Sequence, residues 1–176
     1  MSAYTDIEFR SNLITTLIFP LFDYCAALYG DLTGILDTKL QTALNSCVRY
    51  VFGLGCREHI TPYRHQLGWL TARNRRLYLS SRLLHKTLIT SSPPYLSDLF
   101  EFHEPIHPSR REGPQIKIQF TFSQQLMDSF SVHTAKFWNS LPASMRMADT
   151  VSRHKDQLKE YLLESELSQA SSLFTP

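Results

Sequence analysis

The chain has 176 residues, of which 43% are hydrophobic and 19% are charged, and its net charge is +2. This length and composition exclude a largely disordered protein and one that needs a disulfide or metal crosslink to fold. The small net charge excludes a general electrostatic attraction to nucleic acid, so such an attraction has to come from a local cluster.

Two helices are predicted in the first third of the chain. Apolar residues recur at helical spacing over residues 7–29, where Pro20 is expected to kink or split the helix because it lacks an amide hydrogen. A second apolar stripe covers residues 36–54, and we expect the two segments to form a helical hairpin. The apolar run 13–28 predicts a buried helix and not a membrane span or signal peptide, because it contains Asp23 and is shorter than the ~20 residues of a spanning helix.

Two further helices are predicted in the middle of the chain. Thr61 and Pro62 are typical of a helix start, with a hydroxyl at the cap and a proline in the first turn. A longer helix is expected over residues 71–89, and the sequence Ser-Ser-Pro-Pro at 91–94 stops it. One or two helical turns are expected over residues 95–100.

The last third of the chain predicts a small hairpin. Proline and charge over residues 102–114 indicate an irregular loop, and alternating apolar residues over 115–122 indicate a half-buried strand. Its partner is expected over 129–133, because a lone strand is not stable. Helices over 135–141 and 150–164 complete the predicted elements.

The predicted fold class is mainly α. We expect a bundle of about five to six helices with one small β-hairpin near residues 115–133. The predicted organisation is a helical region over 1–100, the hairpin with the C-terminal helices over 101–164, and a frayed tail over 165–176.

Basic residues concentrate in the middle of the chain. The stretch 57–86 holds seven of them against Glu58 alone, a local charge of +6, whereas 149–166 holds three basic and five acidic residues, a charge of −2. A basic middle indicates an anionic partner, because arginines along a helix contact successive phosphates. The alternative is a solvated helix face. Trp69 and Trp138 lie among apolar neighbours and are expected in the core rather than as base-stacking platforms. The candidate nucleic-acid-binding residues are Arg73, Arg75, Arg76, Arg82 and Lys86.

The sequence holds no local catalytic motif. It has no glycine-rich phosphate loop, no HExxH and no GxSxG, and its aspartates are scattered rather than paired to hold two metal ions. A serine–histidine–aspartate triad assembled from distant positions remains an alternative.

The cysteines form no CxxC pair. Their odd number, Cys25, Cys47 and Cys56, indicates a reducing compartment, which is the nucleus or the cytoplasm. Cys56 and His59, with His65 nearby, are of the types that bind zinc, but structural zinc sites carry two tight ligand pairs. The favoured interpretation is therefore ordinary loop residues, with no metal and no cofactor.

Five blocks of sequence follow one another along residues 10–163. They are FPLFDYC at 19–25, LGWL at 67–70 followed by RRLY at 75–78 and Lys86, PYLSDLF at 94–100, FSVHTAKFWNSLP at 130–142, and a final helix with Lys155, Leu158, Lys159 and Leu162. In this order the blocks resemble the C-terminal, thumb and post-thumb region of non-LTR (LINE-type) retrotransposon reverse transcriptases.

The resemblance implies a binding module rather than an enzyme. In that family the metal-binding aspartates lie in an upstream palm, so this chain is expected to start at roughly the thumb, with residues 1–100 thumb-like. The implied partners are RNA, DNA or an RNA–DNA hybrid, bound weakly and without sequence specificity beside the polymerase portion of a retrotransposon protein, with no membrane involved.

The chain departs from this family in one segment. In those reverse transcriptases the segment before the block at 130–142 usually carries more arginine than residues 115–122 do here, which gives that segment no clear nucleic-acid role. The alternative function is that of a degenerate or captured fragment, a structural or protein-interaction scaffold that binds no nucleic acid.

Overall fold

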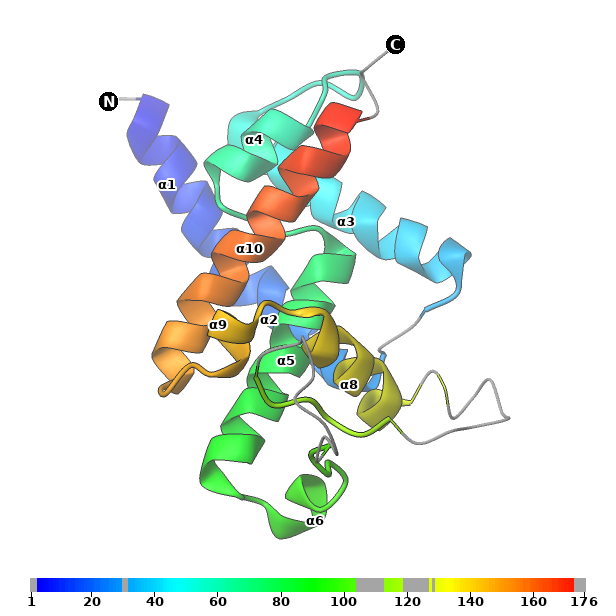
Figure 1. Cartoon of the computed structure of the whole chain (residues 1–176). Helices are drawn as coiled ribbons and strands as arrows, with labels where there is room; N and C mark the ends of the chain where they lie inside the picture. The colour runs from blue at the N-terminus through cyan, green and yellow to red at the C-terminus, as the bar shows by residue number, and fades with distance from the viewer. Residues whose placement is uncertain (1–2, 30–31, 104–112, 119–126, 128, 173–176) are drawn as a thin grey trace. The chain divides into compact units, whose positions relative to one another are not determined.

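The part of the chain that the structure describes is mainly helical, which confirms the predicted fold class. The computed structural model describes residues 3–29, 32–103, 113–118, 127 and 129–172 (Figure 1). The chain divides into two compact units, the first made of residues 1–26, 32–75 and 163–176 and the second of residues 27–31 and 76–162. The division falls within two helices, α5 (Ala72–Thr90) and α10 (Val151–Ser172).

The first unit is built around α3 (Gly34–Phe52). Its other elements are α1 (Ala3–Leu13), the π-helix η1 (Ile14–Ile18), α2 (Phe19–Asp23), α4 (Thr61–Gln66), the start of α5 and the end of α10. Its buried core consists of Ile14, Phe19, Leu44, Val48, Val51 and Trp69. Helix α3 supplies half of this core because its apolar residues recur every three or four positions. Trp69 is a core residue, as predicted, and its ring meets the Phe19 ring edge to face at 4.6 Å between centroids.

The helix interruption that was expected at Pro20 is present as a widened helical turn, η1, which lies just before this proline. The amide of Phe19 donates to the carbonyl of Ile14, five residues back, so η1 is a π-helical turn. A proline ring clashes with the carbonyl four residues earlier in a regular α-helix, and a π-helical turn is one known way of relieving such a distortion. Helix α2 then starts with Pro20 in its first turn. Phe19 directly follows this turn, and its side chain is buried in the core.

The second unit packs short helices around α5 and α10. They are α6 (Pro94–Ser97), α8 (Phe130–Ser140) and α9 (Ala143–Arg146), and the short 3₁₀-helix η2 (Ala26–Leu28) lies at the division between the units. Buried apolar residues here include Leu84, Val132, Ala135, Trp138, Leu141, Leu158 and Leu162. Trp138 is therefore core, as predicted, with 1% of its surface exposed.

The predicted β-hairpin is not seen. Residues 119–126 and 128 lie outside the described residues, but the expected second strand, 129–133, starts helix α8. Phe130, Thr134 and Trp138 are spaced four apart, and with Val132 and Ala135 they give this segment a helical period that outweighs its local alternation. In the described residues, the first strand is reduced to one antiparallel bridge, between Phe102 and Ile116.

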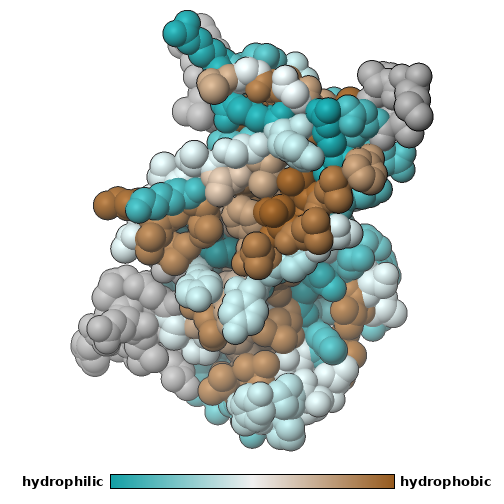
Figure 2. All heavy atoms as spheres, turned by 180° about the vertical axis from the view of Figure 1, so that it is seen from behind, coloured by the Kyte–Doolittle hydropathy of each residue, from teal (hydrophilic) through white to brown (hydrophobic). Residues whose placement is uncertain are grey.

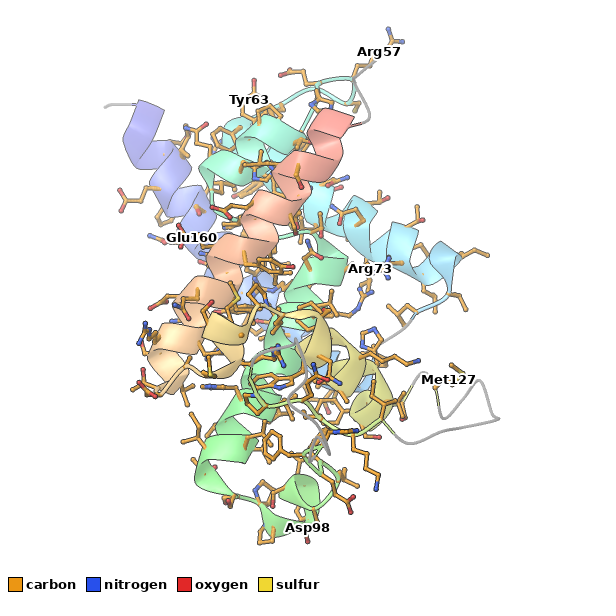
Figure 3. All side chains as sticks on the ribbon, viewed as in Figure 1. Arg57, Tyr63, Arg73, Asp98, Met127 and Glu160 are labelled. Carbon is orange, nitrogen blue, oxygen red and sulfur yellow. The ribbon has the colours of Figure 1, made fainter. Side chains whose placement is uncertain are left out.

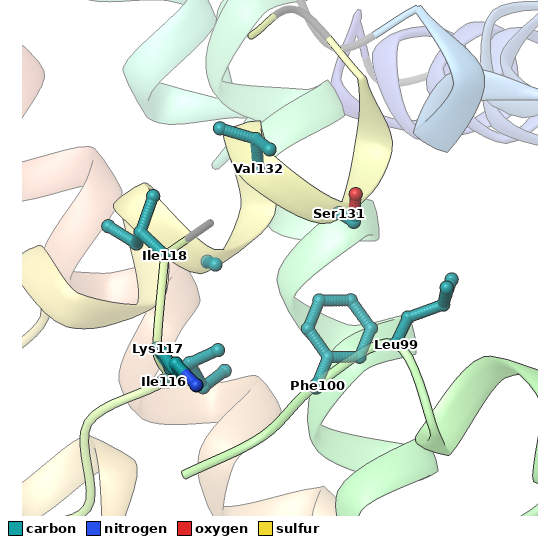
Figure 4. A pocket seen from close by; sticks show the side chains of 8 residues that line it. Leu99, Phe100, Ile116, Lys117, Ile118, Ser131 and Val132 are labelled. Carbon is teal, nitrogen blue, oxygen red and sulfur yellow. The ribbon is translucent and has the colours of Figure 1, made fainter. Parts of the chain in front are cut away.

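The Asn139 side chain binds the backbone of Ile116 on the side where the predicted partner strand was expected. The Asn139 amide accepts from the backbone N–H of Ile116 at 2.9 Å and donates to its carbonyl at 2.8 Å. Asn139 thus satisfies both backbone groups of a residue that is 3% exposed. Figure 4 shows Ile116, Phe100 and Val132 among the side chains that line a small pocket.

Helix α10 continues to Ser172, through residues that were expected to fray from position 165. Glu166 anchors this part of the helix, as described below. No helix in the described ranges is both long enough and apolar enough to cross a membrane.

Candidate nucleic-acid interface

Helix α5 carries all five candidate nucleic-acid-binding residues, and its start is fixed by a buried carboxylate. Glu166 accepts from the backbone N–H of Thr71 and from its hydroxyl, both at 2.9 Å, and from the amide of Asn74 at 2.7 Å. The Thr71 hydroxyl in turn accepts from the Asn74 backbone N–H at 3.3 Å. These bonds satisfy donors that a helix start leaves without partners, so α5 begins at a defined position.

Glu166 also pairs with Arg64. Arg64 Nη2 donates to Glu166 Oε2 at 2.7 Å, and 7% of Arg64 and 8% of Glu166 are exposed. A buried pair of this kind is costly to leave half-made, because the remaining charge then has neither water nor a partner. The Glu166 cluster, comprising Arg64, Thr71, Asn74 and Glu166, therefore holds α4, the start of α5 and the end of α10 together within the first unit.

Two of the five candidates present their charge to solvent without an ion pair among the described residues. Arg73, in the first unit, and Lys86, in the second, are both exposed. Charged side chains with no carboxylate partner are the groups that can contact phosphate without losing an existing bond.

The Arg75 side chain is engaged by contacts within the first unit. Its Nε and Nη2 contact the two carboxylate oxygens of Asp23 at 2.5 and 2.7 Å, a two-pronged ion pair. The guanidinium also lies over the Phe19 ring, 4.0 Å from its centroid. Arg75 therefore links α5 to α2, and its charge is already matched by a carboxylate.

Arg76 and Arg82 are the remaining candidates. Arg76 is 6% exposed, so its guanidinium is inside the protein and not on a solvent-facing helix surface. Arg82 is half-buried, with its guanidinium 5.3 Å from the centroid of the Tyr78 ring. The structure therefore does not gather the five residues into one solvated basic face.

An open, polar depression in the first unit was not among the predicted sites. It has a volume of about 540 Å³ and is lined by residues of α3, of the loop before α4, of α4 itself and by Thr71. Among the described residues that line it are three arginines, Arg49, Arg57 and Arg64, and one acidic residue, Glu58. Arg57 and Arg64 were counted in the basic stretch, but Arg49 lies outside it, so the charge count alone did not reveal the depression.

Cys56 and His59 also line this depression, and both are exposed. Within the described ranges there is no group of three or more histidine, cysteine or acidic side chains placed to hold a metal ion. His65, the third residue considered as a zinc ligand, is half-buried, and burial and the nearby Arg64 charge lower its pKa.

The second unit buries a serine–histidine pair. His154 Nδ1 lies 3.0 Å from the Met145 carbonyl, to which it must donate, so its Nε2 accepts from the Ser81 hydroxyl at 3.3 Å. Serine and histidine are the residue types of nucleophilic sites, yet both residues are 0% exposed. No substrate reaches them in this structure, so the arrangement is one of polar packing.

Two more rings stack around this pair. The His85 ring is parallel to the His154 ring, with 4.0 Å between centroids, and the Trp138 ring lies 5.5 Å from His154. Burial, with a smaller contribution from His85, lowers the pKa of His154 to about 4, against the hydrogen bond to Met145, which raises it. Burial also lowers the pKa of His85. Both rings are therefore neutral at pH 7.

Comparison of the chain with models of protein families, with curated proteins and with solved structures gave no match.

Proposed function

We propose that the chain is a non-catalytic module that contacts the sugar–phosphate backbone of a template–primer nucleic acid, like the C-terminal region of the reverse transcriptases that it resembles. The observation that carries the proposal is that several cations of the basic stretch 57–86 are exposed and free of ion pairs in the described part of the chain. They are Arg57, Arg73 and Lys86. Arg57 extends away from the ribbon (Figure 3).

This set of cations suits weak binding without sequence preference. Contacts to phosphate oxygens position a protein on a nucleic acid but read no bases. Each phosphate neutralised contributes about 0.7 to 0.9 to the slope of log K against log salt, so two or three contacts give a slope of roughly −2. Arg75 and Arg76 contribute little in this proposal, because one is paired with Asp23 and the other is buried.

The test is fluorescence anisotropy of the full chain with a labelled RNA–DNA hybrid, titrated over a range of salt. The double variant Arg73→Gln with Lys86→Gln is expected to bind about tenfold more weakly at low salt and to have a shallower salt slope. The matched control is Lys155→Gln with Lys159→Gln, which removes the same charge from exposed positions of the acidic helix α10. Equal weakening in both double variants would mean that only net charge matters, and no binding at low salt would refute the proposal.

The second candidate function is a protein-interaction scaffold, and an exposed apolar stripe favours it. Leu17 in η1, Leu21 in α2 and Tyr24 directly after α2 are four and three residues apart and are 64%, 73% and 76% exposed. Figure 2 shows hydrophobic side chains gathered in patches on the face that it displays. Large exposed apolar patches are typical of surfaces that contact another protein.

Two measurements distinguish the nucleic-acid-binding module from the protein-interaction scaffold. A scaffold would show no salt-dependent anisotropy change with the hybrid, and replacement of Leu17 and Leu21 by Ser would change its association state in light scattering. A nucleic-acid module would bind the hybrid with the same affinity after those replacements.

A further inference from the structure

The depression in the first unit has a cationic lining that internal carboxylates match only in part. Arg49, Arg57 and Arg64 line it, and Glu58 is the one acidic residue in the described part of its lining. Glu58 is engaged by the loop, because its Oε1 accepts from the backbone N–H of Gly55 at 3.0 Å. Arg64 is neutralised by Glu166, so the balance of the lining remains positive.

Arg49 shapes the depression and leaves its charge unpaired. Its Nε donates to the Gly55 carbonyl at 3.3 Å and its Nη2 to the Cys56 carbonyl at 3.1 Å. These bonds fold the loop back over the end of α3, where Gly53 adopts a left-handed conformation at φ 67°. Carbonyls carry no full charge, and no carboxylate lies within ion-pair distance of Arg49 among the described residues.

A second observation points to a ligand with acceptor atoms. Arg64 is more than nine-tenths buried, and its Nε has no hydrogen-bond partner within the described residues. A buried N–H donor without an acceptor is unfavourable, and such groups are rare in folded proteins. Arg64 also lines the depression, so this unsatisfied donor belongs to a side chain of the site.

The neutral residues of the lining are also suited to an anion. Gln41 and Asn45 bind each other through Gln41 Nε2 and Asn45 Oδ1 at 2.8 Å, which directs the Asn45 amide nitrogen to other acceptors. His59 is exposed at the rim and can donate a further N–H. The depression therefore offers guanidinium, amide and imidazole donors in one place.

We infer that this depression is an anion site that holds a phosphate group, with Arg57 and Arg49 as its charged contacts. The inference rests on the proposed function for the source of the phosphate, which is a phosphodiester of the nucleic-acid backbone. Arg57 is the exposed cation of the lining, and Arg49 is the cation that the Gly55 and Cys56 carbonyls hold in place. Free inorganic phosphate has the same chemistry, and the experiment separates the two sources.

The experiment uses the full chain and two probes. The labelled RNA–DNA hybrid is followed by anisotropy across salt, and inorganic phosphate is titrated into isotope-labelled protein while the backbone amide resonances of residues 55–61 are recorded. Arg57→Gln is the test variant because its side chain is exposed and bonds to nothing described. Arg153→Gln, an exposed arginine of α10, is the matched control.

The expected result is that Arg57→Gln weakens hybrid binding about fivefold to tenfold at low salt and reduces the salt slope by about 1, while Arg153→Gln changes neither. Phosphate is expected to shift the resonances of residues 55–61 in the parent chain and to shift them less in Arg57→Gln.

Three other outcomes separate the anion site from the proposed function. Hybrid binding that Arg57→Gln leaves unchanged, with no phosphate shifts at residues 55–61, overturns the anion site and leaves the proposed function standing. Phosphate shifts without any hybrid binding refute the proposed function and support the anion site with free phosphate as the source. Neither signal refutes both.

Discussion

The two units bury polar groups in different ways. The first unit buries a charged pair, Arg64 with Glu166, and satisfies the carboxylate with four donors. The second unit buries neutral rings: His154 bonds through both nitrogens, to the Met145 carbonyl and the Ser81 hydroxyl, and His85 bonds through Nε2 to the Ala148 carbonyl. The first arrangement fails when a charge loses its partner, whereas the second fails when a ring gains a charge. Because the buried polar side chains differ in type, the two units set different conditions for their stability.

Removing the carboxylate of Glu166 is expected to have the largest effect. Glu166→Ala leaves the Arg64 guanidinium buried without its partner and three donors near the start of α5 unsatisfied, a loss of about 3–5 kcal/mol. Urea denaturation followed by circular dichroism measures it. The control is Glu164→Ala, which changes an exposed carboxylate on the same helix and is expected to alter stability by less than about 0.5 kcal/mol. Similar losses in both variants would contradict the role given to the Glu166 cluster.

Acid is expected to destabilise the second unit by a slightly smaller amount. The pKa of His154 falls to about 4 in the folded chain, below the ~6.5 of an unfolded histidine. The unfolded state therefore binds the proton more tightly, so stability is complete above pH 6.5 and is lost progressively as the pH falls towards 4. At 1.36 kcal/mol per pKa unit, the loss reaches about 3 kcal/mol.

The check is urea denaturation at a series of pH values, with His154→Gln as the comparison. Glutamine keeps a donor and an acceptor but cannot gain a proton in this range, so the variant is expected to be less stable at pH 7 and to lose the His154 share of the pH dependence. A variant that retains the full slope between pH 6.5 and 4 would show that another group controls it. The lowered pKa of His85 acts in the same direction and leaves a residual slope.

Replacing Asp23 is expected to have the smallest effect of the three. Asp23→Asn removes the charge opposite Arg75, whose side chain is 21% exposed, so water compensates in part and the loss is about 1 kcal/mol. Thermal denaturation measures the loss. In the anisotropy assay, the same variant is expected to bind the hybrid at least as tightly as the parent, because a cation has been released from its partner. Weaker binding would contradict a passive, structural role for the Arg75–Asp23 pair.

The helices and the core could be predicted from the sequence, because their signals are local. The apolar stripe over residues 36–54 gives α3, and apolar neighbours identify Trp69 and Trp138 as core. The hairpin prediction was wrong at 129–133 because a five-residue window is too short to separate alternation from the helical period that continues to Trp138.

The use of each basic residue could not be predicted, because their partners are distant in the chain. Asp23 lies 52 residues from Arg75, and Glu166 lies 102 residues from Arg64. A count of charge along the sequence treats all arginines alike, whereas the fold assigns some to ion pairs and leaves others in solvent. Arg49 was missed for the same reason, since only the folded loop brings it beside Arg57 in the lining of one depression.

The backbone around Ile116 has a consequence for association between chains. On one side the segment is bonded to its antiparallel neighbour, with Lys117 N–H donating to the Glu101 carbonyl and His103 N–H to the Gln115 carbonyl. On the other side the Asn139 amide occupies the N–H and the carbonyl of Ile116. Exposed strand edges are templates on which other chains add and aggregate. Because the Asn139 side chain already binds the N–H and the carbonyl of Ile116, these two backbone groups cannot pair with a strand of another chain.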